Sequence, residues 1–336
     1  MKNEKLKNFG EIISIKNLLP AWEEFIKGKR SRRDTQDFSL NLMDNIIALH
    51  NNLINRAYKH GGYEAFKICD PKPRDIHKAC VRDRVLHHAV FRILYSIFDE
   101  GFIFDSYSCR FKKGTNMAVF RLERFLRKLS KNNTRNIFAL KFDIRRFFDS
   151  IDQNILLEII KRKIKDDDTI WLIERIIKSF NNGIPLGNVT SQLFANIYLN
   201  ELDQFIKHKL KIKYYLRYCD DFVILGENKE DLTKLIPLVN NFLKDKLKLT
   251  LHSGKIIIRK YHQGVDFLGY VVLPYYRVLR TKTKRRILKK IRKRRQDLQN
   301  NLISKESFNQ SLQSYLGILK HCKGNKIKKE ILNLIF

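Results

Sequence analysis

Two adjacent aspartates, Asp220 and Asp221, lie between two short apolar runs in the stretch YYLRYCDDFVIL. The apolar residues on both sides predict a β-hairpin that carries the acids at its tip. A third aspartate, Asp143, lies near the end of the segment NIFALKFDI, which predicts a buried strand over residues 136–144. If these strands are neighbours in one sheet, their carboxylates meet at its edge, where divalent cations would neutralise them.

Carboxylates in this arrangement could hold two metal ions that activate an attacking 3′ hydroxyl and stabilise a leaving pyrophosphate. That is the chemistry of a nucleotidyl transferase. The alternative is structural, because Asp is a common turn residue and Asp143 could simply end a strand. The residues of the hairpin by themselves leave both interpretations open.

The charge of the chain indicates an anionic partner. The 336 residues include 67 Lys and Arg against 35 Asp and Glu, a formal net charge of +32. Phosphate groups neutralise such an excess and give affinity that does not depend on sequence, so nucleic acid is the expected partner. The apolar fraction of 43% is sufficient for folded cores, and the length predicts two or three lobes.

Helical and extended patterns alternate along the chain and must position these aspartates. A helical pattern runs from Leu18 to about Tyr63 and is broken at Gly61-Gly62. Further helices are predicted over residues 85–98, 116–129, 153–164, 169–180, from Thr190 or Ser191 onward, and over 229–247. Strands are predicted over residues 249–251, 255–259 and 265–273. Beyond Tyr276 a basic amphipathic helix is expected to place on one face Ile287, Ile291, Leu298 and Leu302.

Several motifs resemble those of reverse transcriptases and occur in the same order. FDIRRFFDSID (142–152), GIPLGNVTSQLFANIYLNELD (183–203), YCDD (218–221), LTLHSGK and VDFLGY are similar to palm motifs, and PKPRDI and VRDRVLHHAV to fingers motifs. The resemblance covers about residues 60–275. It implies an α+β right-hand polymerase with fingers, a ferredoxin-like antiparallel palm sheet and a helical thumb. The expected domains are a basic helical extension over 1–62, fingers and palm over 63–275, and a basic thumb over 276–336.

The resemblance assigns a role to each matching residue. The catalytic, metal-binding groups would be Asp143, Asp220, Asp221 and the backbone carbonyl of Ile144. Phe148 would be the aromatic gate that excludes a ribose 2′ hydroxyl, although it could also be a core residue like Phe147. The other nucleotide-binding residues would be Arg74, Lys78, Arg82, Arg84, Leu186, Gly187, Gln192 and Lys255. The primer grip would comprise Phe267, Leu268 and Gly269.

Basic residues in the last third of the chain would track the backbone of a nucleic-acid duplex. They are Lys282, Lys284, Arg285, Arg286, Lys289 and Lys290. The alternative for this helix is a docking face for a protein partner. For the cations of the fingers motifs, the alternative to a triphosphate contact is ordinary solvation at the surface.

The stretch LGNVTSQ departs from the usual reverse transcriptase pattern. Group II intron and retroviral enzymes usually have Gln-Gly at its start and Ser-Pro at its end, whereas this chain has Leu186 and Gln192 at those ends. The departure resembles reverse transcriptases of diversity-generating retroelements, which implies error-prone copying of template adenines. A Gln at the first position can hydrogen-bond and help hold the nucleotide in register, whereas Leu can only pack. FKICDPKPRDI, DSYSCRFKKGT and SYLGILKHCKGN also resemble that group.

The resemblance also implies cofactors and partners. Two Mg²⁺ ions, for which Mn²⁺ could substitute, would serve catalysis. Deoxynucleoside triphosphates, a template RNA and the cDNA/RNA duplex would bind, and a small basic accessory protein oligomer is expected. One alternative is a cellular, phage-defence or group II intron-like reverse transcriptase without adenine-biased errors. Another is a non-catalytic RNA-binding module with a polymerase fold.

The sequence indicates a cytoplasmic protein that makes no membrane contact, and the resemblance implies that it is encoded by a bacterium or a phage. The start MKNEKLKNFGEIISI does not resemble a signal peptide, and no apolar run approaches the ~18 residues needed to span a bilayer. The five cysteines form no CxxC pair and are expected to be buried free thiols. About 60 residues follow the palm, which is expected to be too few for an RNase H, maturase DNA-binding or endonuclease domain.

Overall fold

The computed structural model describes residues 8–69 and 73–334, which form two compact units. The first unit comprises the described residues of Met1–Arg110, Ile144–Lys211 and Pro237–His252. The second unit comprises those of Phe111–Asp143, Ile212–Ile236 and Ser253–Phe336. Each unit therefore combines segments that are distant in the sequence. The predicted domain boundaries after residues 62 and 275 stay a prediction.

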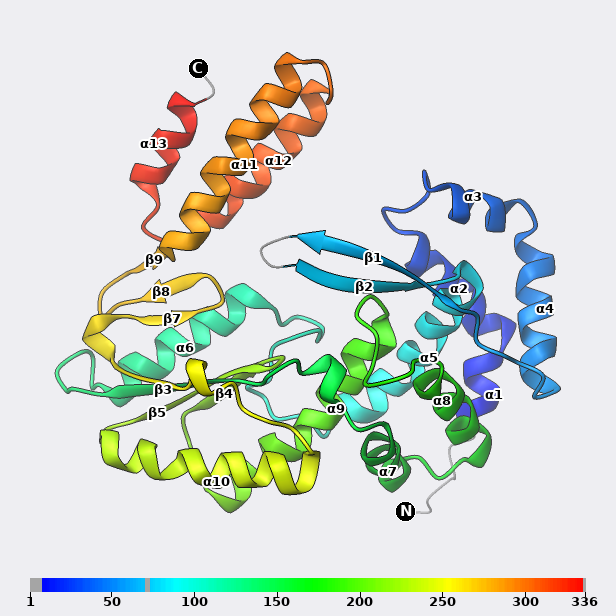
Figure 1. Cartoon of the computed structure of the whole chain (residues 1–336), viewed down its shortest axis with the longest axis horizontal. Coiled ribbons are helices and arrows are strands. Elements are labelled where there is room, and N and C mark those ends of the chain that lie inside the picture. The colour runs from blue at the N-terminus through cyan, green and yellow to red at the C-terminus, as the bar shows by residue number, and fades with distance from the viewer. Residues whose placement is uncertain (1–7, 70–72, 335–336) are drawn as a thin grey trace. The chain divides into compact units, whose positions relative to one another are not determined.

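The first unit is mainly helical and carries one β-hairpin (Figure 1). Its helices are α1 (Asn8–Ile13), α2 (Ile15–Ile26), α3 (Arg33–Leu40), α4 (Leu42–Ile54), α5 (Val81–Asp99), α7 (Gln153–Lys163), α8 (Asp167–Lys178) and α9 (Val189–Gln204). The hairpin pairs β1 (Tyr63–Cys69) with β2 (Pro73–Ala79) in antiparallel fashion. α5 contacts α1, α2 and α9, and its fully buried stripe consists of Val85, Leu86, Ala89 and Val90.

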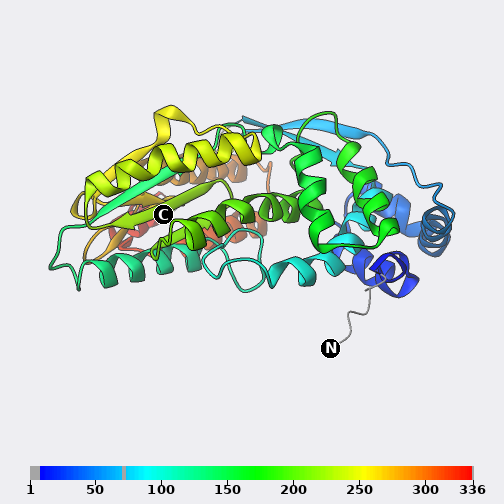
Figure 2. The same ribbon diagram turned by 90° about the horizontal axis from the view of Figure 1, so that it is seen from below.

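The second unit contains a four-stranded antiparallel sheet with the order β4-β5-β3-β6. Its strands are β3 (Phe138–Asp143), β4 (Tyr215–Tyr218), β5 (Asp221–Gly226) and β6 (Ile257–Lys260). The helix α10 (Lys229–Leu247) lies between the last two in sequence, and its residues from Pro237 onward belong to the first unit. Two central strands flanked in this order are the ferredoxin-like arrangement. α6 (Thr115–Leu129) contacts β4 and β5 (Figure 2), and its buried residues Ala118, Leu122 and Phe125 recur at helical spacing.

The C-terminal half of the second unit is a small sheet followed by helices. β7 (Val265–Phe267), β8 (Tyr270–Val272) and β9 (Arg277–Leu279) are antiparallel. Three helices that contact one another follow (Figure 1): α11 (Thr281–Gln299), α12 (Lys305–Leu319) and α13 (Asn325–Asn333). α11 buries Ile287, Leu288 and Ile291. In the described part of the chain, no helix is both long and apolar enough to cross a bilayer.

The helical pattern predicted from Leu18 to Tyr63 is divided into several helices, the last of which ends at Ile54. α2 ends at Ile26 because Gly28 is left-handed (φ +69°) and the basic segment KGKRSRR has no apolar residue to bury. α4 ends well before the glycines at 61 and 62, and Arg56 is left-handed (φ +52°) just beyond it. The glycine pair therefore does not end the helix.

The strand predicted over residues 265–273 is a hairpin, because Phe267 pairs with Tyr270 around a two-residue turn. Leu268 (φ +49°) and Gly269 (φ +89°) are both left-handed, as a type I′ turn requires. Leu rarely adopts this conformation, so the apolar run gave no turn signal. The apolar face predicted for the basic helix also ends early, since Leu302 lies beyond α11 and is 71% exposed.

The prediction of buried thiols is wrong. Cys69, Cys80 and Cys109 are exposed, and Cys219 and Cys322 are half-buried. These residues lie at strand ends, in a turn and in loops rather than on apolar faces. All five are among the described residues, and none forms a disulfide.

Candidate active site

The three predicted acids lie at one end of the second unit's sheet. β3 and β5 are neighbours, and Asp143 is directly opposite Asp221 in their register. Asp220 occupies the two-residue turn between β4 and β5, where Cys219 is left-handed (φ +55°). The condition for a carboxylate cluster, that the two apolar strands pair, is therefore met.

Burial and like charge act together on the cluster. Burial raises the pKa of Asp221 to about 6, and Asp220 and Asp143 act in the same direction, while Lys141 opposes them. The Oδ1 atom of Asp221 is buried and has no hydrogen-bond partner among the described residues. Lys141 Nζ lies 3.1 Å from Asp221 Oδ2, and Lys255 forms an ion pair with Asp143. These two lysines supply the positive charge beside the acids.

The cluster fits a divalent cation only in part. Carboxylate oxygens are the ligands that Mg²⁺ prefers, and Asp221 Oδ1, which accepts no hydrogen bond, could coordinate such an ion. Within residues 8–69 and 73–334, however, no three His, Cys, Asp or Glu side chains are arranged to hold a metal ion. Mg²⁺ is usually bound by one or two carboxylates together with substrate phosphates, so an incomplete protein cage is the expected geometry.

Lys141 also connects the acids to the predicted primer grip. Its Nζ donates to the backbone carbonyl of Asp266 (3.2 Å) and lies 5.8 Å from the centre of the Phe267 ring. Phe267 is fully buried, whereas Leu268 and Gly269 form the turn of the β7–β8 hairpin. The sequence analysis missed Lys141, although a lysine inside the apolar strand FALKFD is the signal that could have indicated it.

Phe148 lies in the first unit, on a short 3₁₀ turn, Phe148–Ser150. Phe147 is a core residue (2% exposed), whereas Phe148 is only half-buried. The carbonyl of Phe148 accepts the N–H of Ile184 (3.0 Å). Gly183 is left-handed (φ +66°), and a Cβ there would lie 2.2 Å from the carbonyl oxygen of Phe148. The 3₁₀ turn that carries Phe148 can therefore pack this closely against residue 183 only because that residue is a glycine.

The Leu186–Gly187 turn packs against β2. The N–H of His77 on β2 donates to the carbonyl of Leu186 (2.9 Å). Gly187 is left-handed (φ +126°), and a Cβ there would lie 3.0 Å from the carbonyl oxygen of His77. Leu186 is half-buried, while Gly187 and Gln192 are exposed. The first unit thus brings the motif that begins at Leu186 next to the strand that carries Arg74 and Lys78.

The four predicted fingers cations differ in their surroundings. Arg74 is exposed on β2, and Lys78 pairs with Asp34 (2.9 Å) and Glu64 (3.2 Å). Arg84 is 9% exposed, pairs with Asp34 (2.5 Å) and lies over the ring of Phe25. Because these partners bury and pair the guanidinium of Arg84, Arg74 is more accessible to a triphosphate than Arg84 is.

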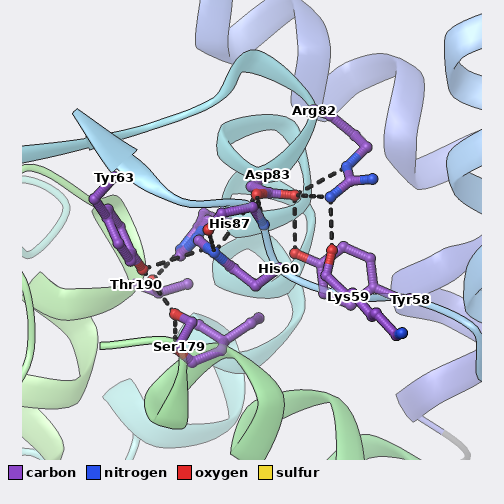
Figure 3. Close-up of polar contacts among 11 residues, drawn as sticks. Tyr58, Lys59, His60, Tyr63, Arg82, Asp83, His87, Ser179 and Thr190 are labelled. Atoms are coloured by element: carbon purple, nitrogen blue, oxygen red, sulfur yellow. Dashed lines mark hydrogen bonds and ion pairs between the residues drawn. The ribbon is translucent and has the colours of Figure 1, made fainter. Parts of the chain in front are cut away.

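A buried polar network that the sequence analysis missed surrounds Asp83 (Figure 3). Asp83 is fully buried and accepts hydrogen bonds from the hydroxyl of Tyr58 (3.0 Å), the N–H of Gly61 (2.6 Å) and the guanidinium of Arg82 (3.0 Å). Arg82 also donates to the carbonyl of Lys59 (2.7 Å). The predicted nucleotide contact Arg82 is therefore held in place from two sides.

Two histidines extend this network to the LGNVTSQ motif (Figure 3). His60 Nδ1 lies 2.6 Å from the carbonyl of Gly61, so this nitrogen carries a proton and donates. His60 Nε2 lies 3.0 Å from His87 Nε2, and His87 Nδ1 lies 2.5 Å from the hydroxyl oxygen of Thr190. Burial, followed by the charge of His60, lowers the pKa of His87 to about 3, which keeps it neutral. Hydrogen bonds therefore join His60, His87 and Thr190 in one chain, and the hydroxyl of Tyr63, 3.3 Å from His60 Nε2, extends it.

The predicted duplex-binding cations lie on α11 in the second unit. Lys282, Arg285 and Lys289 are exposed and recur at helical spacing, so they share one face. Lys284 pairs with Glu330 of α13 (3.0 Å), and Arg286 and Lys290 are half-buried. The exposed face suits contact with a phosphate backbone.

A comparison with protein families matches residues 69–272 to "Reverse transcriptase (RNA-dependent DNA polymerase)". The chain belongs to the reverse transcriptase family. The matched residues contain the aspartates, Phe148 and the LGNVTSQ motif. Enzymes of this family generally use divalent metal ions. Membership in this family is what the sequence motifs implied.

The relatives include proteins encoded by group II introns. The chain is 27% identical over 260 residues to "Group II intron-encoded protein LtrA" of Lactococcus lactis, with 56% of this chain and 42% of LtrA covered. It is 21% identical over 279 residues to "Putative COX1/OXI3 intron 2 protein" of Saccharomyces cerevisiae, with 63% of this chain and 31% of that protein covered. The chain thus spans less than half the length of either relative.

The fold is similar to that of a solved telomerase. The apo telomerase of Candida tropicalis truncated from the C-terminal domain matches with a TM-score of 0.50 and 16% identity, covering 67% of this chain and 55% of that chain. At this identity the likeness concerns the fold alone. Together with the antiparallel sheets and helices, it confirms the predicted α+β polymerase fold class.

Proposed function

We propose that this chain is an RNA-directed DNA polymerase, and the observation that carries the proposal is the carboxylate cluster of β3 and β5. Asp143 and Asp221 face each other in a ferredoxin-like sheet, and Asp220 lies in the adjoining turn. With two Mg²⁺ ions bound, or Mn²⁺ in their place, the site would polarise the 3′ hydroxyl and neutralise the pyrophosphate. The backbone carbonyl of Ile144 is a further proposed ligand.

The remaining predicted residues of the chain would bind and select substrates. The half-buried ring of Phe148 would exclude a 2′ hydroxyl, and Arg74, the most accessible fingers cation, would bind the triphosphate. Lys255, paired with Asp143, would exchange that partner for a phosphate. The β7–β8 turn would hold the primer end, and the exposed face of α11 would follow the cDNA/RNA duplex.

We further propose that the polymerase belongs to a diversity-generating retroelement and copies template adenines inaccurately. Leu186 offers the nucleotide only packing, and its carbonyl is already engaged by His77, so no side-chain hydrogen bond holds the base pair at this position. In this proposal a small basic accessory protein assists synthesis on the template RNA, in the cytoplasm of a bacterium. The alternative is a cellular, phage-defence or group II intron-like enzyme without adenine-biased errors, which the intron-encoded relatives favour.

Primer extension on an RNA template tests the polymerase. We expect Asp220→Ala to abolish cDNA synthesis and Asp245→Ala, which removes an exposed acid of α10, to retain it. Synthesis by Asp220→Ala would show that the carboxylate cluster is not the catalytic centre. Phe148→Ala should admit ribonucleotides more readily, whereas Tyr275→Ala, an exposed aromatic residue, should not.

Sequencing of the cDNA tests the fidelity proposal. Leu186→Gln should reduce errors opposite template adenine, because Gln restores a hydrogen-bonding side chain. Leu302→Gln changes an exposed leucine outside the motif and serves as the matched control. An unchanged error spectrum in Leu186→Gln would remove Leu186 as the cause, and an unbiased spectrum in the unmodified enzyme would favour the alternative.

A further inference from the structure

A cavity outside the carboxylate cluster lies in the first unit, between the segment before β1 and the helix α8. The cavity has a volume of about 460 Å³, which is in the range of small-ligand sites. Trp171, Glu174, Arg175 and Lys178 line it from α8. Their spacing of three and four residues places all four side chains on one face of the helix. Lys59 and His60 form the opposite wall.

The lining has an excess of positive charge. Glu174 forms an ion pair with Lys178, and this hydrogen bond is the main reason that the pKa of Glu174 is lowered. The charge of Arg175 also contributes to lowering the pKa of Glu174, but among the residues that the structure describes neither Lys59 nor Arg175 forms an ion pair. Both side chains are exposed. The cavity therefore offers two cations to an anionic ligand, and the single acid is already neutralised.

The cavity also has an aromatic wall. Trp171 is half-buried, and the ring of Phe9 meets it edge to face at 6.2 Å with an interplanar angle of 75°. This contact holds the indole in one orientation. A base can stack on an indole face, and such stacking contributes about 1–3 kcal/mol per base in nucleic-acid complexes.

The opposite wall is rigid because His60 belongs to the network around Asp83 (Figure 3). Its side chain is 3% exposed, stacks on Tyr63 at 5.0 Å and donates to the carbonyl of Gly61. Tyr63 in turn bonds the hydroxyl of Ser179 (2.8 Å), which also lines the cavity. Trp171 and His60 are thus held in place before any ligand enters, which lowers the entropic cost of binding.

We propose that this cavity binds a nucleotide, with the base stacked on Trp171 and the phosphate between Lys59 and Arg175. The ligand combines a flat aromatic group with an anion, which matches an indole beside two unneutralised cations. A free mononucleotide and an unpaired nucleotide of an RNA share this chemistry. The site does not require polymerase activity, so it can exist whether or not the proposed function holds.

Fluorescence of Trp171 gives a direct test, because the chain has only two tryptophans. Trp22→Phe removes the other one, and titration of that variant with AMP, a short oligoadenylate or inorganic phosphate monitors the cavity alone. We expect saturable quenching by AMP if free nucleotides bind, and by oligoadenylate alone if the ligand must be RNA. The double variant Lys59→Ala/Arg175→Ala should weaken binding more than about tenfold, since it removes two charge-assisted contacts.

Matched controls separate the cavity from the general basic character of the chain. Lys244→Ala/Lys246→Ala removes two exposed cations of α10 in the same unit and should leave the titration unchanged. Equal weakening by both double variants, or no quenching by AMP or oligoadenylate, would overturn the proposal. Binding of phosphate without any effect of a base would also overturn it.

If Trp22→Phe does not fold, the equilibrium binding of radiolabelled AMP and oligoadenylate can be compared between the unmodified chain and Trp171→Ala. Trp171→Ala should bind more weakly, because it lacks the aromatic face on which the base would stack. Equal binding by Trp171→Ala would contradict the proposal. These binding measurements involve no cDNA synthesis, so failure of the polymerase and failure of this site are distinguishable.

Discussion

Replacement of Gly183 by alanine should disturb the turn that carries Phe148. The new Cβ would lie 2.2 Å from the carbonyl oxygen of Phe148, at least 0.8 Å short of the 3.0 Å below which real Cβ contacts essentially do not occur. The obstacle is backbone, so it cannot move aside as a flexible side chain would. Alanine in the left-handed conformation costs about 1–2 kcal/mol, and the threatened Ile184–Phe148 hydrogen bond about 0.5–1.5 kcal/mol more.

We therefore expect Gly183→Ala to lower the free energy of unfolding by about 1.5–3.5 kcal/mol in chemical denaturation followed by circular dichroism. Gly10→Ala is the matched control, because a Cβ on Gly10 in α1 would meet no atom within 4 Å, and this change should stabilise the fold by up to about 1 kcal/mol. Gly183→Ala should also alter discrimination against ribonucleotides, since the ring of Phe148 must move with its backbone. Equal stability of the two variants would refute the close approach.

Three further perturbations address the buried network and the acids. Thr190→Val should destabilise the fold by about 1–3 kcal/mol because the buried His87 Nδ1 loses its hydrogen-bond partner, while Thr190→Ser should not. Equal denaturation midpoints of the two variants would contradict the contact. The pKa of His87 is lowered in the fold, so the unfolded chain binds more protons than the folded chain between about pH 6.5 and pH 3. The free energy of unfolding should therefore fall as the pH drops through this range, by up to about 1.4 kcal/mol per pH unit. His87→Gln should lose this part of the pH dependence, and an identical slope in the variant would argue against a lowered pKa of His87. Lys141→Met removes the charge that lowers the pKa of Asp221, so this pKa should rise above about 6 and the acid limb of the primer-extension pH profile should move to higher pH. Lys141→Arg keeps the charge and should not move the profile. Coincident profiles of the two variants would count against the Lys141–Asp221 ion pair.

The carboxylate cluster could be predicted from the sequence because its signals are local. Asp143 and Asp221 each adjoin an apolar strand, and pairing of those strands is sufficient to bring the acids together. The partners of Arg84 could not be predicted in this way. Asp34 is 50 residues away in the sequence, and only the packing of α3 against α5 makes the guanidinium a buried ion-pair partner.

The buried network escaped the sequence analysis for a similar reason. His60 and His87 are 27 residues apart, and Thr190 is a further 103 residues along the chain, with no motif that joins them. Two adjacent histidines in the apolar segment VRDRVLHHAV were the available signal. The Leu268–Gly269 turn was hidden differently, because a leucine adopted a conformation that glycine or asparagine usually supplies.

The buried hydrogen bonds that join His60, His87 and Thr190 have an evolutionary consequence. A mutation at any one of these positions removes a buried hydrogen bond, whereas Ser for Thr190 preserves it. Single substitutions at these three positions, other than Thr190→Ser, should therefore destabilise the fold. In an alignment of related chains, positions 60 and 87 should be lost or retained together.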